Sequence, residues 1–294
     1  MANKDFIIEE GVLTGYVGAG GDVVIPNEVQ SIGDYAFEDC DALLSVVIPE
    51  GVEKIGSGVF RNCWQLGSVA IPASVREIGE MAFLSCESLT TVTFSEGLEC
   101  ICDEAFSTCV SLTSIALPSS VKDIGKLVFD HCDELGSITV AEGNPMYHSE
   151  GNCLIETETK TLIAGCATSV IPPSVTTIGD ESFVGCRKLK SIVIPAGVRS
   201  IGCLAFHDCT ALRSVTLSEG LEKIEYRAFL GCHRLTSITF PRSLISFTES
   251  FEGCYNLFSV SYMGTVAEWD AVEKDNEGIP ATEVQCTDGD AAFV

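Results

Sequence analysis

Positive charge is scarce in this sequence. Only 17 of its 294 residues are Lys or Arg, against 42 Asp and Glu, so the formal net charge is −25. Because neutralising phosphates requires an excess of Lys and Arg, this balance argues against sequence-independent nucleic-acid binding. It also disfavours docking on anionic lipid. The hydrophobic content of 46% argues against intrinsic disorder.

Long apolar stretches are missing as well. None approaches the roughly 18 residues that a membrane-spanning helix needs. Residues 1–6 lead into alternating acidic residues and Gly, and not into the apolar core of a signal peptide. We therefore expect a chain with no transmembrane segment and no targeting signal.

Catalytic and metal-binding motifs are also missing. The sequence contains no G-x-S-x-G, H-E-x-x-H, P-loop or G-x-G-x-x-G arrangement. It has only four His, and a zinc site needs three or four converging ligands. The sequence therefore predicts neither an enzyme nor a cofactor or metal site.

What the sequence has in quantity is cysteine, and most of it is periodic. Nine of the 15 cysteines occupy one position of a tandem repeat, usually 23 residues apart. They are Cys40, Cys63, Cys86, Cys109, Cys132, Cys186, Cys209, Cys232 and Cys254. An extra 31 residues separate Cys132 from Cys186. Such a period is typical of a solenoid, in which no repeat buries its apolar side alone.

The repeat reads I-G-x-x-A-F-x-x-C-x-x-L-x-S-V-x-I-P-x-x-V-x-x. In the first coil, residues 45–48 alternate and predict a strand that Pro49 ends. Residues 52–55 predict a second short extended piece. Residues 58–63 are interpreted as one helical turn with Val59, Phe60 and Cys63 on one face.

One aromatic position recurs with the cysteines and predicts a buried spine. Its members are Phe37, Phe60, Phe83, Phe106, Phe129, Phe183, Phe206 and Phe229.

These motifs resemble the BspA-type leucine-rich repeat family, over nearly the whole chain. The resemblance implies an α/β repeat solenoid, a right-handed leucine-rich-repeat superhelix of short parallel strands and short helical turns. It also implies a bacterial or protozoan surface or secreted protein with a role in cell adhesion. The expected parts are an N-terminal cap (1–31), five repeats (32–140), a spacer hairpin or second cap (141–177), about four repeats (178–262) and a C-terminal cap and tail (263–294).

The cysteine column allows two interpretations. One is a ladder of disulfides or metal ligands, and the other is a row of inert core thiols. Stacked side chains point in parallel and free Cys behaves as a small hydrophobe, which favours the second. We therefore expect the column to be buried, reduced and free of metal. Cys100-Ile101-Cys102 lies on an extended segment, so its two sulfurs are expected on opposite faces.

Two outward positions of the main strand carry small, mostly hydroxylated residues, and these form the first candidate binding face. The candidates are Ser45, Ser68, Thr91, Ser114, Ser137, Ser191, Ser214, Ser237, Thr93, Thr139, Thr216 and Thr239. Two interpretations stay open: these residues simply suit a closely stacked sheet, or they accept an extended ligand.

The second candidate is a basic patch within residues 186–242, which hold nine bases and four acids. Its residues are Arg187, Lys188, Lys190, Arg213 and Arg234. Lys190 and Arg213 share a position next to the outward Ser and are expected to be neighbours. These bases either balance nearby acids or bind an acidic partner.

The favoured function is a non-catalytic recognition scaffold that binds a protein or glycan, adhesin-like by resemblance. The alternative is an intracellular structural or protein-interaction repeat protein, which the lack of a signal and the many cysteines favour. The partner is expected to be neither nucleic acid nor membrane, and the chain to be a monomer or weakly self-associating.

Overall fold

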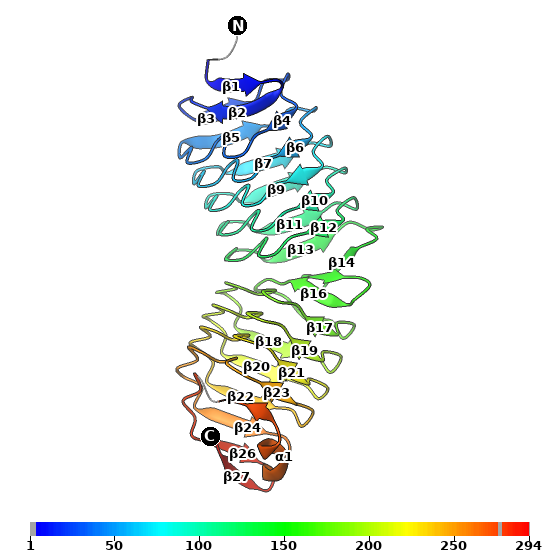
Figure 1. The fold of residues 1–294 in the computed structure, drawn as a ribbon, viewed down its shortest axis with the longest axis vertical. Coiled ribbons are helices and arrows are strands. Elements are labelled where there is room, and N and C mark those ends of the chain that lie inside the picture. Colours follow the sequence, from blue (N-terminus) through cyan, green and yellow to red (C-terminus); the bar gives the residue numbers. More distant parts are fainter. Residues whose placement is uncertain (1–3, 276–277, 294) are drawn as a thin grey trace. The chain divides into compact units, whose positions relative to one another are not determined.

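The structure is a computed structural model that describes residues 4–275 and 278–293. The chain divides into two compact units, Met1–His148 and Ser149–Val294. Each unit is a β-solenoid of stacked coils, in which longer strands form one sheet and mostly shorter strands form the other (Figure 1). The division falls within β14 (Tyr147–Glu150).

The main sheet of the first unit has the order β13-β11-β9-β7-β5-β3. Its strands are β3 (Gly21–Val24), β5 (Leu43–Val47), β7 (Ser68–Ile71), β9 (Thr91–Phe94), β11 (Ser114–Leu117) and β13 (Ser137–Val140). The second sheet has the order β1-β2-β4-β6-β8-β10-β12. Its strands are β1 (Phe6–Glu9), β2 (Val12–Tyr16), β4 (Ser31–Ile32), β6 (Lys54–Ile55), β8 (Glu77–Ile78), β10 (Cys100–Ile101) and β12 (Asp123–Ile124).

The second unit repeats this arrangement. Its main sheet has the order β18-β20-β22-β24-β26-β27, with β18 (Ser191–Ile194), β20 (Ser214–Leu217), β22 (Ser237–Phe240), β24 (Ser259–Tyr262), β26 (Glu283–Cys286) and β27 (Gly289–Ala292). The other sheet continues from β14 through β15 (Cys153–Glu156), β16 (Thr161–Ala164), β17 (Thr177–Ile178), β19 (Ser200–Ile201), β21 (Lys223–Ile224), β23 (Ser246–Phe247) and β25 (Glu273–Lys274).

Antiparallel pairing brings together strands that are close in sequence. β1 pairs with β2, β15 with β16, and β26 with β27. The β15–β16 pair lies within residues 141–177, where the sequence predicts a spacer hairpin or second cap. The assignment of these strands as caps, and the five-part division of the chain, stay predictions.

The prediction of a helical turn at residues 58–63 is wrong. In the second coil, the amides of Gly58, Phe60 and Asn62 donate to carbonyls of the following coil at 2.7–2.9 Å. Gly58 and Asn62 have φ angles of 58° and 60°, which no α-helix contains. The segment is therefore a series of turns, and its alternate amides donate hydrogen bonds to the next coil. In a helix these amides would donate to carbonyls of the same helix. The helix of the described residues is α1 (Val266–Asp270), which Thr265 and Glu268 cap reciprocally.

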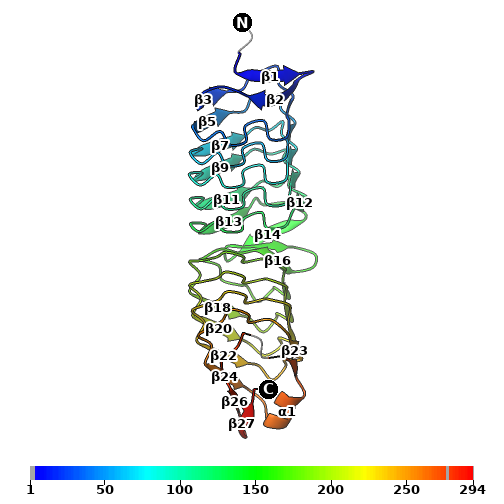
Figure 2. The ribbon, with the colours of Figure 1, turned by 60° about the vertical axis from the view of Figure 1, so that its left-hand side comes forward.

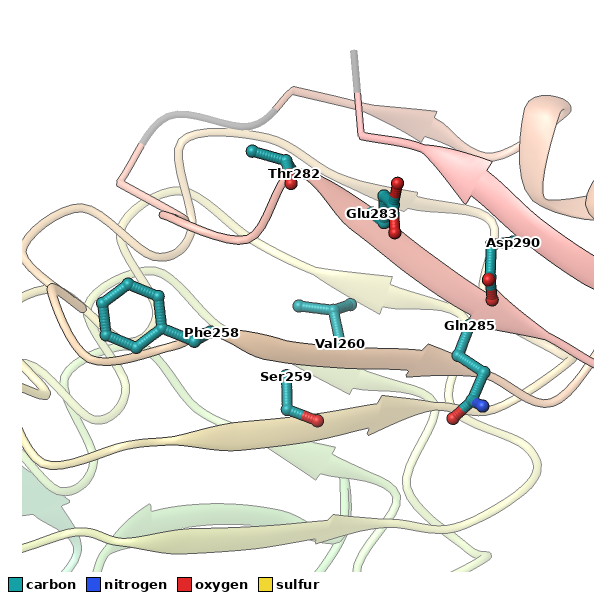
Figure 3. Close-up of a pocket in the computed structure, with 7 residues that line it drawn as sticks. All are labelled: Phe258, Ser259, Val260, Thr282, Glu283, Gln285 and Asp290. Atoms are coloured by element: carbon teal, nitrogen blue, oxygen red, sulfur yellow. The ribbon is translucent and has the colours of Figure 1, made fainter.

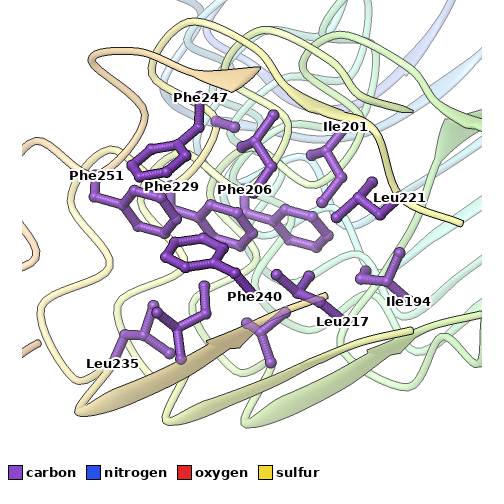
Figure 4. Packing of buried hydrophobic residues seen from close by; sticks show 14 of the residues in the cluster. Ile194, Ile201, Phe206, Leu217, Leu221, Phe229, Leu235, Phe240, Phe247 and Phe251 are labelled. Atoms are coloured by element: carbon purple, nitrogen blue, oxygen red, sulfur yellow. The ribbon is translucent and has the colours of Figure 1, made fainter. Parts of the chain in front are cut away.

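The core positions of the repeat are confirmed. Phe37, Phe60, Phe83, Phe106 and Phe129 stack in the first unit with ring centroids 5.0–6.2 Å apart. In the second unit, Phe183 stacks on Phe206 at 4.9 Å. Phe206, Phe229 and Phe251 continue the stack at 5.1 Å (Figure 4). All of these rings are buried. The same coil that buries them presents the alternate residues of its main strand to solvent.

Candidate functional site

The candidate hydroxyl residues lie on the outer faces of the two main sheets. We call them the hydroxylated strip of each unit. In the first unit the strip comprises Ser45, Ser68, Thr91, Ser114, Ser137, Thr93 and Thr139. In the second it comprises Ser191, Ser214, Ser237, Thr216 and Thr239. Ten of the twelve are exposed, whereas Ser45 and Ser137 are half-buried.

The alternation of the strands produces these faces. In β20, Val215 and Leu217 are buried while Ser214 and Thr216 are exposed. Ser214 aligns with Ser191 of β18 on one side and with Ser237 of β22 on the other. Parallel strands lie about 4.8 Å apart, so their hydroxyls form a closely spaced row. Figure 2 shows the rows of strands that carry them within each unit.

The five bases of the basic patch are all exposed and all lie in the second unit. Lys190 directly precedes β18 and Arg213 directly precedes β20. The amide of Arg213 donates to the carbonyl oxygen of Lys190 at 2.9 Å, so the two residues are neighbours as the sequence predicts. Lys188 and Arg234 occupy the same repeat position in two coils that are separated by one other coil. Ala211 holds this position in the coil between them.

Ion pairs divide the bases of this region into two groups. Arg199, Arg227 and Arg242 each bind a Glu carboxylate. Lys190, Arg213 and Arg234 form no ion pair within residues 4–275 and 278–293. Charge balance with nearby acidic residues therefore explains the bases of the first group, but it does not explain Lys190, Arg213 and Arg234.

An open pocket of about 590 Å³ joins the two candidate sets. Its lining includes Thr168, Arg187, Lys188, Lys190 and Ser191. Three bases of the patch and the first residue of the second unit's hydroxylated strip therefore face one hollow. The structure does not place Arg213 or Arg234 in that lining.

A second pocket, of about 270 Å³, lies at the other end of the same sheet (Figure 3). Its lining includes the exposed ring of Phe258 and the side chains of Ser259, Glu283, Gln285 and Asp290. Sequence reasoning missed the last three because they lie in the tail outside the repeat. The alternation of residues 283–286 was the available signal, since β26 pairs with β24 and brings Gln285 beside Ser261.

The cysteine column is mostly buried. Seven of its nine thiols are buried, whereas Cys40 and Cys186, which open the two series of repeats, are half-buried. Burial raises the pKa of Cys63 to about 12 and that of Cys86 well above its ordinary value. These thiols are therefore neutral and unreactive near pH 7.

The expectation for Cys100 and Cys102 is wrong. Their Sγ atoms lie 3.8 Å apart and not on opposite faces. The reason is that β10 ends at Ile101, so the strand alternation does not reach Cys102. Both thiols line an open pocket of about 490 Å³ in the first unit, together with Glu77 and Asp123.

Neither a metal cluster nor a membrane-spanning helix occurs in the described part of the chain. No group of three or more His, Cys, Asp or Glu there is arranged to hold a metal ion. His131 and His207 each lie beside the Asp next to them in sequence. No helix among these residues has both the length and the apolar character that crossing a bilayer requires.

Comparison with known proteins agrees with this fold. Residues 21–136 and 165–271 match the sequence profile of the BspA type leucine rich repeat region, in 6 copies. No curated protein sequence matches the chain.

Several solved structures are similar. A leucine rich cell surface protein of Faecalibacterium prausnitzii is 25% identical, with a TM-score of 0.60 and coverage of 93% of this chain and 97% of that one. The pneumococcal vaccine antigen PcpA is 25% identical, with a TM-score of 0.66 over 82% of this chain and 67% of that one. A leucine rich repeat protein of T. pallidum is 28% identical, with a TM-score of 0.52 over 72% and 90%. Since the profile covers most of the sequence, the chain belongs to the BspA-type leucine-rich repeat family.

Proposed function

We propose that the chain is a non-catalytic recognition scaffold that binds a protein or glycan through the outer face of its second main sheet. The observation that carries the proposal is that the hydroxylated strip of the second unit lies next to two bases of the basic patch. The hydroxylated strip of the second unit begins beside Lys190 and Arg213, which are exposed and have no acidic partner among the described residues.

The chemistry of this face suits an extended ligand. Serine and threonine hydroxyls both donate and accept hydrogen bonds, so a row of them can bind either a peptide backbone or sugar hydroxyls. Their side chains are small and leave the sheet open to close approach. The two bases beside the row add a preference for an acidic partner. Small residues would also suit close strand packing alone, and the binding experiment below separates these interpretations.

A surface location is part of the proposal. The similar Faecalibacterium prausnitzii structure is described as a cell surface protein. By this likeness we propose an adhesin-like role, in which the solenoid contacts a partner outside the cell. The monomer or weakly associating state is likewise proposed.

A second candidate is an intracellular protein-interaction scaffold. The observation that favours it is that none of the fifteen cysteines, all of which lie within the described residues, forms a disulfide bond. Proteins of oxidising compartments commonly pair their cysteines, whereas cytosolic thiols stay reduced. Fractionating the native cells and locating the protein by immunoblot distinguishes the two locations.

The binding proposal is tested by probing arrays of glycans and of surface proteins with the intact chain. Thr216→Trp places a large side chain in the middle of the strip, and Ala196→Trp places the same side chain at another exposed position of the second unit. We expect the first variant to lose the binding partner and the second to retain it. Equal binding by the two variants would show that the strip is only packed surface.

A further inference from the structure

Two thiols meet at the surface of the first unit. Cys100 begins β10 and Cys102 directly follows this strand, and their sulfurs lie 3.8 Å apart. A disulfide bond is about 2.05 Å long. A shift of less than 2 Å in the side chains would therefore bring the sulfurs to bonding distance.

The neighbouring coils leave both thiols accessible. Cys100 and Cys102 are half-buried and line the open pocket of about 490 Å³. Gly79 and Gly125 occupy the repeat position of Cys102 in the coils on either side, and both line the same pocket. Because glycine has no side chain, neither neighbour covers the Cys102 sulfur. The buried column thiols have no such opening.

The surroundings of the pair are acidic. Glu77 of β8 and Asp123 of β12 are the register partners of Cys100 on its two sides. Glu80 and Asp103 also line the pocket. The nearby cation, Lys54, binds Glu77 at 2.8 Å. Four carboxylates thus surround the thiols, and one of them is neutralised by an ion pair.

We propose that Cys100 and Cys102 are a dithiol site that small disulfides, cationic ones preferentially, oxidise to an intramolecular disulfide. In the first step one thiolate attacks a sulfur of the small disulfide, its S–S bond breaks, and one thiol leaves with the proton. In the second step the other thiolate attacks the mixed disulfide and releases the second thiol. Overall, two cysteines lose two electrons and two protons, and the small disulfide gains them.

The two thiols are expected to have different parts. Either one can donate the hydrogen bond between the two sulfurs. Burial raises the pKa of Cys102, but its hydrogen bond with Cys100 and the charge of Lys54 oppose this rise. We therefore take Cys102 as the nucleophile and Cys100 as the resolving thiol. Burial and the neighbouring Cys102 raise the pKa of Cys100 to about 12. Because the thiolate is the reactive form, oxidation is slow near pH 7 and accelerates as pH increases.

The carboxylates give the site its charge preference. Negative side chains around a pocket raise the local concentration of cations and lower that of anions, by tenfold or more at low salt. Cystamine carries two ammonium groups, whereas glutathione disulfide carries net negative charge. Cystamine is therefore expected to oxidise the pair on the order of tenfold faster at low ionic strength, and added salt is expected to reduce this ratio.

The experiment treats the reduced, intact protein with cystamine, with neutral bis(2-hydroxyethyl) disulfide, or with glutathione disulfide. Peptide mapping by mass spectrometry follows each cysteine over time. We expect the peptide containing Cys100 and Cys102 to lose two hydrogens and to regain them with dithiothreitol. Asp123→Asn should lower the ratio of the cystamine rate to the glutathione disulfide rate without abolishing oxidation.

Two serine variants and one internal control complete the design. Cys100→Ser should accumulate a stable mixed disulfide at Cys102, whereas Cys102→Ser should react more slowly at Cys100. Cys203 is the internal control, because it is also half-buried. The residues at its repeat position in the two neighbouring coils are Asp180 and Tyr226, and neither of them carries a thiol. Cys203 should form only a mixed disulfide.

Two results would overturn the proposal. If Cys100 and Cys102 give separate mixed disulfides and no intramolecular bond, they are not a dithiol site. If the three oxidants keep the same relative rates at low and high salt and in Asp123→Asn, the carboxylates do not select the oxidant.

Discussion

The thiol of Cys86 donates a hydrogen bond to the backbone carbonyl oxygen of Phe60 in the preceding coil, at 3.2 Å. The same contact, at 3.2–3.3 Å, recurs from Cys63, Cys109, Cys132, Cys209, Cys232 and Cys254 to the corresponding Phe carbonyls. The column thiol therefore fills apolar space and also supplies a second hydrogen bond to a buried carbonyl oxygen, since the Phe60 carbonyl also accepts from the amide of Cys63 at 3.1 Å. This double role explains why the position holds Cys and not Ala.

Replacing one column thiol is expected to destabilise the first unit. Cys86→Ala removes one of the two hydrogen bonds to the Phe60 carbonyl oxygen, which still accepts from the amide of Cys63 at 3.1 Å. Losing one hydrogen bond costs about 0.5–1.5 kcal/mol. Urea unfolding followed by circular dichroism measures the loss. Cys203→Ala is the matched control, since Cys203 is half-buried outside the column, and its midpoint should stay close to that of the unchanged protein. A Cys86→Ala midpoint equal to that of the control would refute a structural role for the thiol hydrogen bond.

Shortening the aromatic spine is expected to cost more. The Phe83 ring stacks between Phe60 and Phe106, at centroid distances of 5.0 and 5.1 Å, and is fully buried. Phe83→Ala should lower the free energy of unfolding by about 3–5 kcal/mol. Phe258→Ala removes a ring that is 67% exposed and should change the unfolding midpoint little. Thermal unfolding of both variants checks the difference, and similar losses in the two would contradict the packing seen here.

Stability is expected to decrease at alkaline pH. The pKa of Cys63 is raised to about 12 by burial, whereas an unfolded thiol has a pKa of about 8.5. The folded state thus holds this proton more tightly, so the contribution is complete below pH of about 8.5 and is lost as pH rises through the folded-state value. Urea midpoints at pH 7.5 and 10 should differ less for Cys63→Ala than for the unchanged protein. The same pH dependence in both would exclude the thiol as its source.

The 23-residue period predicted the parts of the fold that depend on burial. The column positions of Phe60 and Cys63 and the outward position of Ser68 follow from which side of a repeated coil is apolar, and any stacked arrangement preserves that pattern. The helical turn was wrong because Val59, Phe60 and Cys63 share a face in a helix and also in the observed turns. The hydrogen bonds to the next coil and the positive φ angles of Gly58 and Asn62 separate the two, and the repeat pattern shows neither.

The candidate sites were predictable to a similar extent. The neighbouring positions of Lys190 and Arg213 follow from the period alone. Three features needed coordinates: the hollow that Arg187, Lys188 and Lys190 line, the end of β10 that brings Cys102 beside Cys100, and the pairing of the tail with β24. Each depends on where a short strand stops or on which segment lies next to it, and the repeat leaves both undetermined.

Reversing the charge of the patch is expected to slow capture of the partner found on the arrays. Lys190→Glu with Arg213→Glu replaces two exposed bases that have no ion pair among the described residues, and rim charges act chiefly on association rate. The association rate, measured by surface plasmon resonance, should fall about tenfold at low salt and converge with that of the unchanged protein as salt screens the charges. Lys160→Glu with Lys223→Glu makes the same change in net charge at exposed positions outside the patch and should have a much smaller effect. If the two double variants bind at the same rate throughout the salt series, the patch has no part in recognition.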